Sequence, residues 1–270
     1  MFSPYYAWSG RADPENHCTV NVALYGAEGK RWAMTERGRG ALSRSADALV
    51  IGPSALRWAK DALMIDIDEI CAPLPRRLRG TITLEAEALN ARAFMLEAKG
   101  AHVWRPIAPT ARVRVAMTSP RASWSGSGYF DMNFGDEPLE AAFARWTWSR
   151  ARTRSGAVVL YDAERRREAP LSLALRFGAD GGCETLASPP DASLPRTVWR
   201  LPRETRSDDA RAHIVESFED TPFYSRALVS HRLGGEAVRS VHESLSLERF
   251  AKPAVKAMLP FRMPRSPFSP

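Results

Sequence analysis

The chain has 270 residues, of which 44% are hydrophobic, so it can form one large domain or two small ones with a substantial core. Its net charge is +7, but only five of its 38 basic residues are lysines, and the arginines are scattered along the chain. Because no long basic block or recognition motif accompanies this charge, composition argues against a nucleic-acid-binding protein.

The cysteines and the N-terminus point to a reducing compartment. Cys18, Cys71 and Cys183 are far apart and form no C-x-x-C pair, so neither a disulfide framework nor a zinc site is expected. The chain shows no charged leader followed by an apolar core, and no run approaches the 18 or so apolar residues that span a bilayer. A cytoplasmic protein with at most peripheral membrane contact is therefore expected.

The first half of the chain alternates short extended segments with turns. An aromatic string at 2–8 leads into a turn-rich loop, and the two-residue alternation of 18–25 predicts a strand that pairs with 31–36 as a hairpin. Further short strands are predicted at 48–51, 55–58, 62–68, 80–85 and 111–117.

The second half continues this pattern. Residues 157–162 and 171–177 flank the charged loop AERRREAP as a predicted hairpin, and a strand is predicted at 196–201 inside a proline-marked segment. Extended segments follow at 211–216, 225–233 and 235–249, and short helical segments are predicted at 137–143 and 254–259. Many short strands with regular turns predict an all-β sandwich or barrel. A change in composition at 141–155 predicts a boundary between a domain of residues 1–145 and a second domain of residues 146–270.

The stretch WSGSGYFDMNFGDEPLE, residues 124–140, is the candidate functional site. If 128–133 is extended, Tyr129, Asp131 and Asn133 share one face, while Phe130 and Met132 share the other. A solvated polar face of an ordinary strand would show the same spacing. Spacing alone leaves both interpretations open.

Other candidate residues have simpler interpretations. Asp136 and Glu137 form a paired-carboxylate alternative to Asp131, although a turn before Pro138 is the simpler explanation. The acids at 66, 68 and 69 fit the outer face of a strand. The five histidines show no metal-ligand spacing, and phosphate-binding loops and a G-x-S-x-G elbow are absent from the sequence. Neither a metal nor a nucleotide cofactor is expected.

Several long strings of the sequence carry a resemblance to a known family. They are FSPYYAWSGRADPENHCTVNVALYG, RWAMTERGRGAL, IGPSALRW, LMIDIDEICAPLPRRLRG, GYFDMNFGDEPLE, VHESLSLERF and MLPFRMPR. In these strings the chain resembles the carotenoid 1,2-hydratase family of photosynthetic bacteria. The resemblance implies two lipocalin-like β-barrel domains side by side. It also implies a hydro-lyase that adds water to the terminal C1=C2 bond of acyclic carotenoids such as neurosporene and lycopene, without a cofactor. Family members usually carry residues ahead of the first string, so a start at Met1 leaves open whether the first barrel closes without an exposed edge.

The resemblance also implies roles for particular residues. Asp131 matches the family's acid, which protonates the alkene and then accepts a proton from water, and Tyr129 matches a tyrosine that holds the carboxyl or the water. Trp104 matches an aromatic residue whose ring stabilises a tertiary cation, although a core position is the alternative. Lining of the polyene is expected from Tyr5, Tyr6 and Trp8, with a core role equally open. The tryptophans at 124, 146 and 148 are expected to be packing residues.

Two rival functions use the same fold, namely a non-catalytic carotenoid or lipid carrier and a pericyclase-like polyene cyclase. A polyene substrate must be collected from a bilayer, so peripheral contact with the cytoplasmic face of the inner or intracytoplasmic membrane is expected. The tail 250–270 is the predicted contact. It interleaves basic and apolar residues: Lys252, Lys256, Arg262, Arg265, Met258, Leu259, Phe261, Met263 and Phe268.

Overall fold

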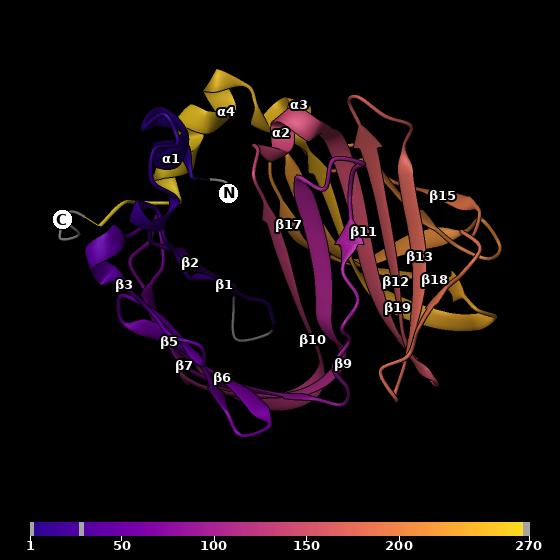
Figure 1. Cartoon of the computed structure of the whole chain (residues 1–270), viewed down its shortest axis with the longest axis horizontal. Coiled ribbons are helices and arrows are strands. Elements are labelled where there is room, and N and C mark those ends of the chain that lie inside the picture. The colour runs from indigo at the N-terminus through magenta and orange to yellow at the C-terminus, as the bar shows by residue number, and fades with distance from the viewer. Residues whose placement is uncertain (1–2, 27–29, 267–270) are drawn as a thin grey trace. The chain divides into compact units, whose positions relative to one another are not determined.

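The computed structural model describes residues 3–26 and 30–266 and shows an all-β protein, with 57% of residues in strands and 11% in helices (Figure 1). The predicted fold class is confirmed. Phe2 of the first string and residues 267–270 of the tail, Phe268 among them, lie outside the described residues.

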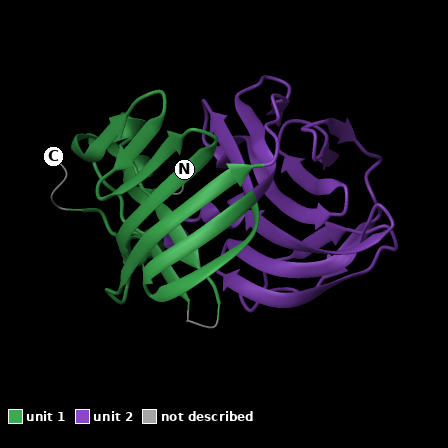
Figure 2. Cartoon of the chain, turned by 90° about the horizontal axis from the view of Figure 1, so that it is seen from below, with its two compact units in different colours: residues 1–86, 112–128, 256–270 green, residues 87–111, 129–255 purple. Residues whose placement is uncertain are grey.

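The chain divides into two compact units (Figure 2). Unit 1 contains residues 1–86, 112–128 and 256–270, and unit 2 contains residues 87–111 and 129–255. The chain passes between the units four times. It crosses after Ala86, inside the two long strands β9 (His102–Ser119) and β10 (Arg121–Gly135), and after Val255. The predicted division into domains at residue 145 stays a prediction.

Unit 1 is built from short antiparallel strands. They are β1 (Asn21–Leu24), β2 (Arg31–Met34), β3 (Leu42–Arg44), β4 (Ala48–Ile51), β5 (Ser54–Ala59), β6 (Ala62–Ile70) and β7 (Arg77–Ala86). The hairpin of β1 and β2 is a separate sheet, and the others continue β9 and β10 in the order β10-β9-β7-β6-β5-β4-β3. One core cluster contains Ile67, Leu78 and Val115. A Cβ at Gly80 would lie 2.6 Å from the Ala116 carbonyl oxygen, so glycine permits close packing of β7 on β9 here.

Unit 2 contains a seven-stranded sheet in the order β14-β13-β12-β11-β19-β18-β17. Its strands are β11 (Phe143–Thr153), β12 (Gly156–Arg165), β13 (Leu171–Gly178), β14 (Cys183–Thr185), β17 (Ala212–Asp220), β18 (Tyr224–Leu233) and β19 (Glu236–Ser246). A separate hairpin joins β15 (Asp191–Leu194) to β16 (Arg203–Arg206), and β8 (Phe94–Met95) pairs with β9. Every residue from 156 to 161 on β12 is buried, so this strand forms part of the core.

The helices are all short. They are α1 (Pro4–Trp8), α2 (Leu139–Ala142), α3 (Leu247–Phe250) and α4 (Pro253–Met258), with 3-10 turns η1 (Pro14–Asn16), η2 (Arg39–Ala41) and η3 (Leu259–Phe261). The helical segments predicted at 137–143 and 254–259 correspond to α2 and α4. Both predicted hairpins are confirmed, as β1 with β2 and as β12 with β13.

Two sequence predictions are wrong. Residues 196–201 form a turn instead of a strand, because Thr197 and Leu201 close it by a hydrogen bond and Arg200 adopts a left-handed φ of 58°. The last extended segment ends at Ser246, whose hydroxyl accepts a hydrogen bond from the Arg249 N–H and caps α3.

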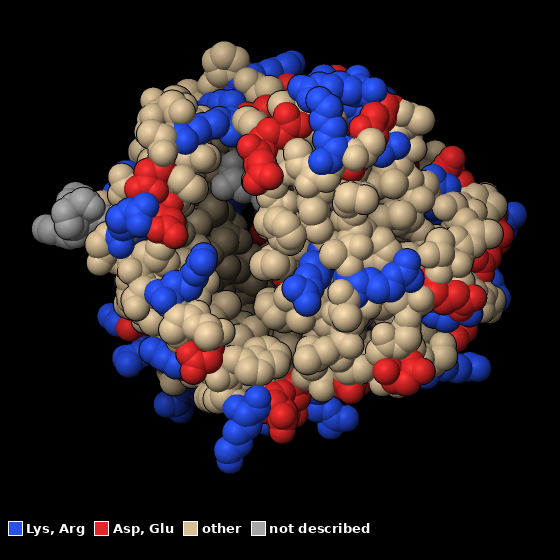
Figure 3. All heavy atoms as spheres, viewed as in Figure 1, with Lys and Arg blue, Asp and Glu red and all other residues tan. Residues whose placement is uncertain are grey.

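The charges on the visible face are mixed in sign (Figure 3), and the described helices are short. Lys and Arg side chains are interspersed with Asp and Glu over the face shown in Figure 3. Within residues 3–26 and 30–266, no helix has the length and apolar character needed to cross a bilayer.

Candidate active site

The candidate site is centred on the Asp131 carboxyl in unit 2. The two-residue period of β10 places Tyr129 and Asp131 on the same face, and Trp104 comes from β9. The Trp104 indole Nε1–H donates a hydrogen bond of 2.8 Å to Asp131 Oδ2, and the Tyr129 hydroxyl donates one of 3.0 Å to the same oxygen. The fold therefore brings together the three residues that the resemblance singles out for chemistry, while their roles stay predictions.

Aromatic rings surround this carboxyl. Trp104 is fully buried, and its ring centroid lies 5.3 Å from that of Tyr161 and 5.4 Å from that of Phe94. The Tyr129 ring lies 5.1 Å from the ring of Trp148. The side-chain hydrogen bonds to Asp131 thus come from neutral donors held in place by aromatic packing.

Burial controls the titration of this group. It raises the pKa of the Asp131 carboxyl above its ordinary value of 3.8, against the hydrogen bonds from Trp104 and Tyr129, and the negative charge of Glu243 raises it further. Burial, together with the charge of Asp131, raises the pKa of the Tyr129 phenol well above its usual range. Burial likewise raises the pKa of the Tyr161 phenol. Both phenols are therefore neutral near pH 7.

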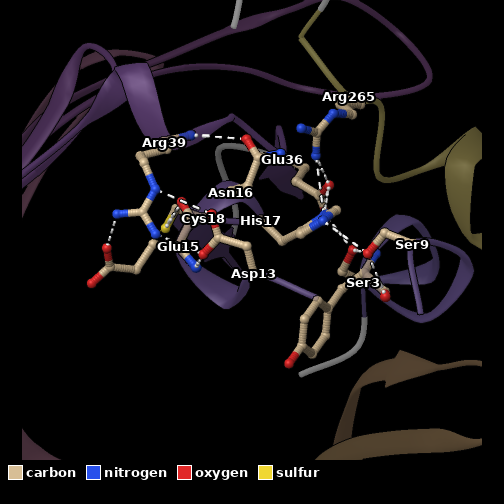
Figure 4. A network of polar contacts seen from close by, with 11 residues as sticks. Ser3, Ser9, Asp13, Glu15, Asn16, His17, Cys18, Glu36, Arg39 and Arg265 are labelled. Atoms are coloured by element: carbon tan, nitrogen blue, oxygen red, sulfur yellow. Dashed lines mark hydrogen bonds and ion pairs between the residues drawn. The ribbon is translucent and has the colours of Figure 1, made fainter. Parts of the chain in front are cut away.

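The predicted polyene-lining residues lie in unit 1. Tyr5, Tyr6 and Trp8 belong to α1, whose N-terminus is capped by the Ser3 hydroxyl through a 2.9 Å hydrogen bond from the Tyr6 N–H. Ser3 also donates to the buried carboxylate of Glu36, which anchors the start of α1 (Figure 4). Trp8 is 58% exposed. A lining role for these three residues stays a prediction.

The paired carboxylates that follow β10 have different surroundings. Asp136 is exposed, and its backbone N–H donates to the Ala101 carbonyl. Glu137 lies 3.6 Å from an Arg167 nitrogen and 3.9 Å from His102 Nε2. These carboxylates lie in a charged setting that suits a surface turn better than proton donation to an alkene. Asn133 is exposed too, so of the polar face predicted for β10 only Tyr129 and Asp131 lie among the aromatic side chains.

Sequence reasoning missed three residues near the site. Trp148, expected to be a packing residue, contacts Tyr129, and Tyr161 contacts Trp104. Glu243 acts on Asp131 through its charge. These residues come from β11, β12 and β19, and only the cross-strand register brings them together. The signal for Glu243 was its place in the string VHESLSLERF. By contrast Trp124 is 50% exposed, so its expected packing role is wrong.

Metal ligation has little support in this part of the chain. Within residues 3–26 and 30–266, no group of three or more His, Cys, Asp or Glu side chains is arranged to hold a metal ion. The chemistry that the described site can offer is proton transfer at Asp131 beside polarisable rings.

Fold and site together define an all-β protein of lipocalin-like architecture that keeps a carboxylic acid among aromatic side chains. The fold is similar to the crystal structure of a Nitrosomonas europaea protein described as a candidate AttH, with a TM-score of 0.57 and 11% identity over 84% of this chain and 80% of that one. The model of the carotenoid hydratase CrtC family matches residues 1–269. This chain belongs to the CrtC carotenoid hydratase family.

Relatives support the same assignment. The chain is 55% identical to the acyclic carotenoid 1,2-hydratase of Thiocapsa roseopersicina, over 98% of this chain and 67% of the relative. It is 47% identical to that of Rubrivivax gelatinosus over the same shares. It is also 44% identical to that of Cereibacter sphaeroides, over 99% of this chain and 96% of the relative. The resemblance found in the sequence is confirmed.

Proposed function

We propose that this chain is a hydro-lyase that adds water across the terminal C1=C2 bond of acyclic carotenoids such as neurosporene and lycopene, giving 1-hydroxy carotenoids. Family membership supports the reaction class. The observation that carries the mechanism is the Asp131 carboxyl, which accepts hydrogen bonds from Trp104 and Tyr129 on a single oxygen. Because both donors reach Oδ2, Oδ1 is the oxygen that carries the transferable proton.

The reaction needs a strong, positioned acid because an alkene is a weak base. Asp131 gives its proton to C2, the π electrons form the new C–H bond, and a tertiary cation remains at C1. Water attacks C1, and its proton passes to the Asp131 carboxylate, which restores the acid. No electrons are gained or lost, so the chemistry requires no redox cofactor.

The aromatic rings have a defined part in this scheme. The faces of Trp104 and Tyr161 can stabilise the cation, with each favourable contact worth about 2 kcal/mol when desolvated. The Tyr129 hydroxyl and the Trp104 Nε1–H fix the carboxyl so that Oδ1 stays directed to the substrate. Tyr5, Tyr6 and Trp8 are proposed to line the polyene.

Incorporation of solvent oxygen tests the proposal. Purified protein is incubated with lycopene in H₂¹⁸O, and the product is examined by mass spectrometry. A hydratase gives a hydroxylated product that carries ¹⁸O. A carotenoid carrier returns unmodified lycopene, and a pericyclase-like cyclase gives an isomer without the label, so either result overturns the proposal.

We also propose that the protein collects its substrate at the cytoplasmic surface of a membrane through its C-terminal segment. Several basic or apolar side chains in the described part of this segment are engaged within the protein, which leaves few residues for membrane contact. Met263 is buried, Arg265 is ion-paired with Glu36, and Arg262 stacks 4.3 Å from the Trp32 ring centroid. Met258, 51% exposed, and Phe261, 72% exposed, are the apolar side chains best placed for shallow insertion.

A double substitution tests this contact without removing Arg265. Met258→Ser with Phe261→Ser should weaken sedimentation with anionic liposomes and lower turnover of liposome-embedded carotenoid, while turnover of detergent-dispersed carotenoid is kept. The matched control replaces Leu74 and Val198 by serine, because these apolar residues are exposed elsewhere, at 64% and 91%. Unchanged liposome binding, or equal losses in both variants, would exclude this segment as the contact.

A further inference from the structure

A second carboxylate lies on the same sheet as the candidate site. The strand register pairs Trp148 on β11 with Tyr161 on β12 on one side and with Glu243 on β19 on the other. The next strand, β18, pairs Arg226 with Glu243. Directly paired residues of antiparallel strands share a face, so these four side chains form a row across four strands.

The row leads from Glu243 to Asp131. Trp148 packs on Tyr129 with ring centroids 5.1 Å apart, and Tyr161 packs on Trp104 at 5.3 Å. Tyr129 and Trp104 are the two residues that donate hydrogen bonds to Asp131. The path from Glu243 to Asp131 therefore runs through two aromatic side chains, Trp148 and Tyr129.

Arg226 fixes the position of Glu243. Its Nε and Nη2 lie 2.9 and 2.8 Å from Glu243 Oε1, with the two side chains 29% and 24% exposed. Arg226 also lies over the Tyr224 ring, 5.6 Å from its centroid. A carboxylate held by a guanidinium and by ring packing keeps its charge at a defined place.

The charge of Glu243 acts on the groups around it. It raises the pKa values of Asp131, Tyr161 and Tyr224, in each case after the larger effect of burial. Arg150 on β11 is the cation that acts on Tyr129, and burial lowers the pKa of its own guanidinium to about 10. Glu219 on β17 adds negative charge at Tyr224.

We propose that Glu243, fixed by Arg226, is a positioning residue that keeps the proton on Asp131 until the alkene takes it. Ionisation of Asp131 would place a second negative charge near the first in a poorly solvated site, and this disfavours loss of the proton to solvent. The expected effect of Glu243 on turnover rests on the proposed hydratase function. The expected effect of Glu243 on the titration of Asp131 does not depend on that function.

The test compares Glu243→Gln with Glu164→Gln. Glu164 is a matched control because it lies on β12 of the same sheet and pairs with Arg145 as an exposed ion pair. In Glu243→Gln the alkaline limb of the pH profile of kcat/KM should move to lower pH, so that above the wild-type midpoint activity is several-fold lower, while the acid plateau is kept. Glu243→Asp, which retains the charge, should restore the profile. Glu164→Gln should leave it unchanged.

A substrate-free measurement separates this inference from the proposed function. The midpoint of the Asp131 carboxyl titration, followed by ¹³C NMR, should fall in Glu243→Gln. It should rise in Arg226→Gln, which removes the countercharge and also serves if Glu243→Gln does not fold. An Asp131 midpoint that neither variant moves, or that Glu164→Gln moves equally, overturns the inference. Failure of the ¹⁸O assay overturns the hydratase and leaves this result standing.

Discussion

Asp131 in unit 2 is partly buried and Glu36 in unit 1 is buried, and the surroundings of the two carboxylates differ in kind. Glu36 is 1% exposed and meets charged or chargeable partners, with its Oε1 2.8 Å from His17 Nδ1 and ion-paired with Arg265 (Figure 4). Asp131 accepts only from the neutral Trp104 indole and Tyr129 phenol among its side-chain hydrogen bonds. A cation compensates a buried carboxylate, whereas neutral rings leave it inclined to keep a proton.

Glu69 supports the same distinction. It was expected on the outer face of a strand, and this is wrong, because it is 1% exposed. It pairs with Arg37 at 2.7 Å and accepts from the Ser54 hydroxyl at 2.7 Å. It follows the pattern of Glu36. In this molecule the cationic partner, more than the degree of burial, separates a structural carboxylate from a candidate acid.

The largest effect is expected from Asp131→Asn. This change removes the transferable proton and keeps the shape of the side chain, so turnover should fall by roughly 10²–10⁴-fold or below detection, while folding and carotenoid binding are retained. Product formation and a binding titration measure the two properties on one preparation. Retention of more than a few per cent of activity would move the acid elsewhere, with Glu137 the next residue to replace.

Glu36→Gln should lower stability rather than turnover. This change removes the carboxylate charge that pairs with the partly buried Arg265 and should cost about 1.5–3 kcal/mol in the free energy of unfolding. Turnover per folded molecule should fall far less than in Asp131→Asn. Urea unfolding measures the loss, and Glu85→Gln, which breaks the exposed pair with Arg114, should cost less than about 1 kcal/mol. Equal losses of unfolding free energy in Glu36→Gln and Glu85→Gln would show that burial of the Glu36 ion pair adds no stability.

Trp104→Phe and Tyr129→Phe each remove one hydrogen bond to Asp131 and keep a ring. The rate should fall by about 10–100-fold, because a hydrogen bond to a carboxylate contributes about 1.5–3 kcal/mol. Both bonds lower the pKa of Asp131, so the alkaline limb of activity should move to higher pH, opposite to Glu243→Gln. If the alkaline limb of activity moves to lower pH in either variant, the removed hydrogen bond does not stabilise the ionised Asp131 carboxylate.

The smallest effect is expected in the pH dependence of stability. The raised pKa of Asp131 contributes stability that is fully present below its ordinary value of 3.8 and is lost as pH rises through the raised value. Asp131→Asn does not titrate, so relative to the wild type it should gain stability as pH rises, by about 1.4 kcal/mol per unit of pKa shift. Thermal unfolding from pH 4 to pH 9 measures this difference. A constant difference would contradict the raised pKa.

The sequence predicts much of the fold because short alternating segments determine strands locally. The hairpins of β1 with β2 and of β12 with β13 follow from periodicity and turn residues. The turn at 196–201 was missed because this segment is rich in residues that favour strands, namely Thr197, Val198 and Trp199, whereas Arg200 adopts a left-handed φ. The pattern of residue types along 196–201 does not show that Arg200 adopts this conformation.

Some residues of the candidate site could be predicted from the sequence, and others could not. Tyr129 and Asp131 share a face because of their spacing on one strand, whereas Trp104 was named from family resemblance alone. Trp148, Tyr161 and Glu243 lie on three strands whose register is fixed only when the sheet of unit 2 forms. No spacing rule connects positions 148, 161 and 243, so this part of the site required the structure.

The titration of the Asp131 carboxyl tests the central claim most directly. Protein labelled with ¹³C at the aspartate carboxyl is titrated by NMR, and Asp131→Asn identifies the resonance. The account predicts a midpoint above the ordinary value of 3.8, because neutral aromatic surroundings and Glu243 both disfavour the charged form. A midpoint at or below 3.8 would show that Asp131 is ionised as readily as a surface aspartate, and it would contradict its assignment as the acid.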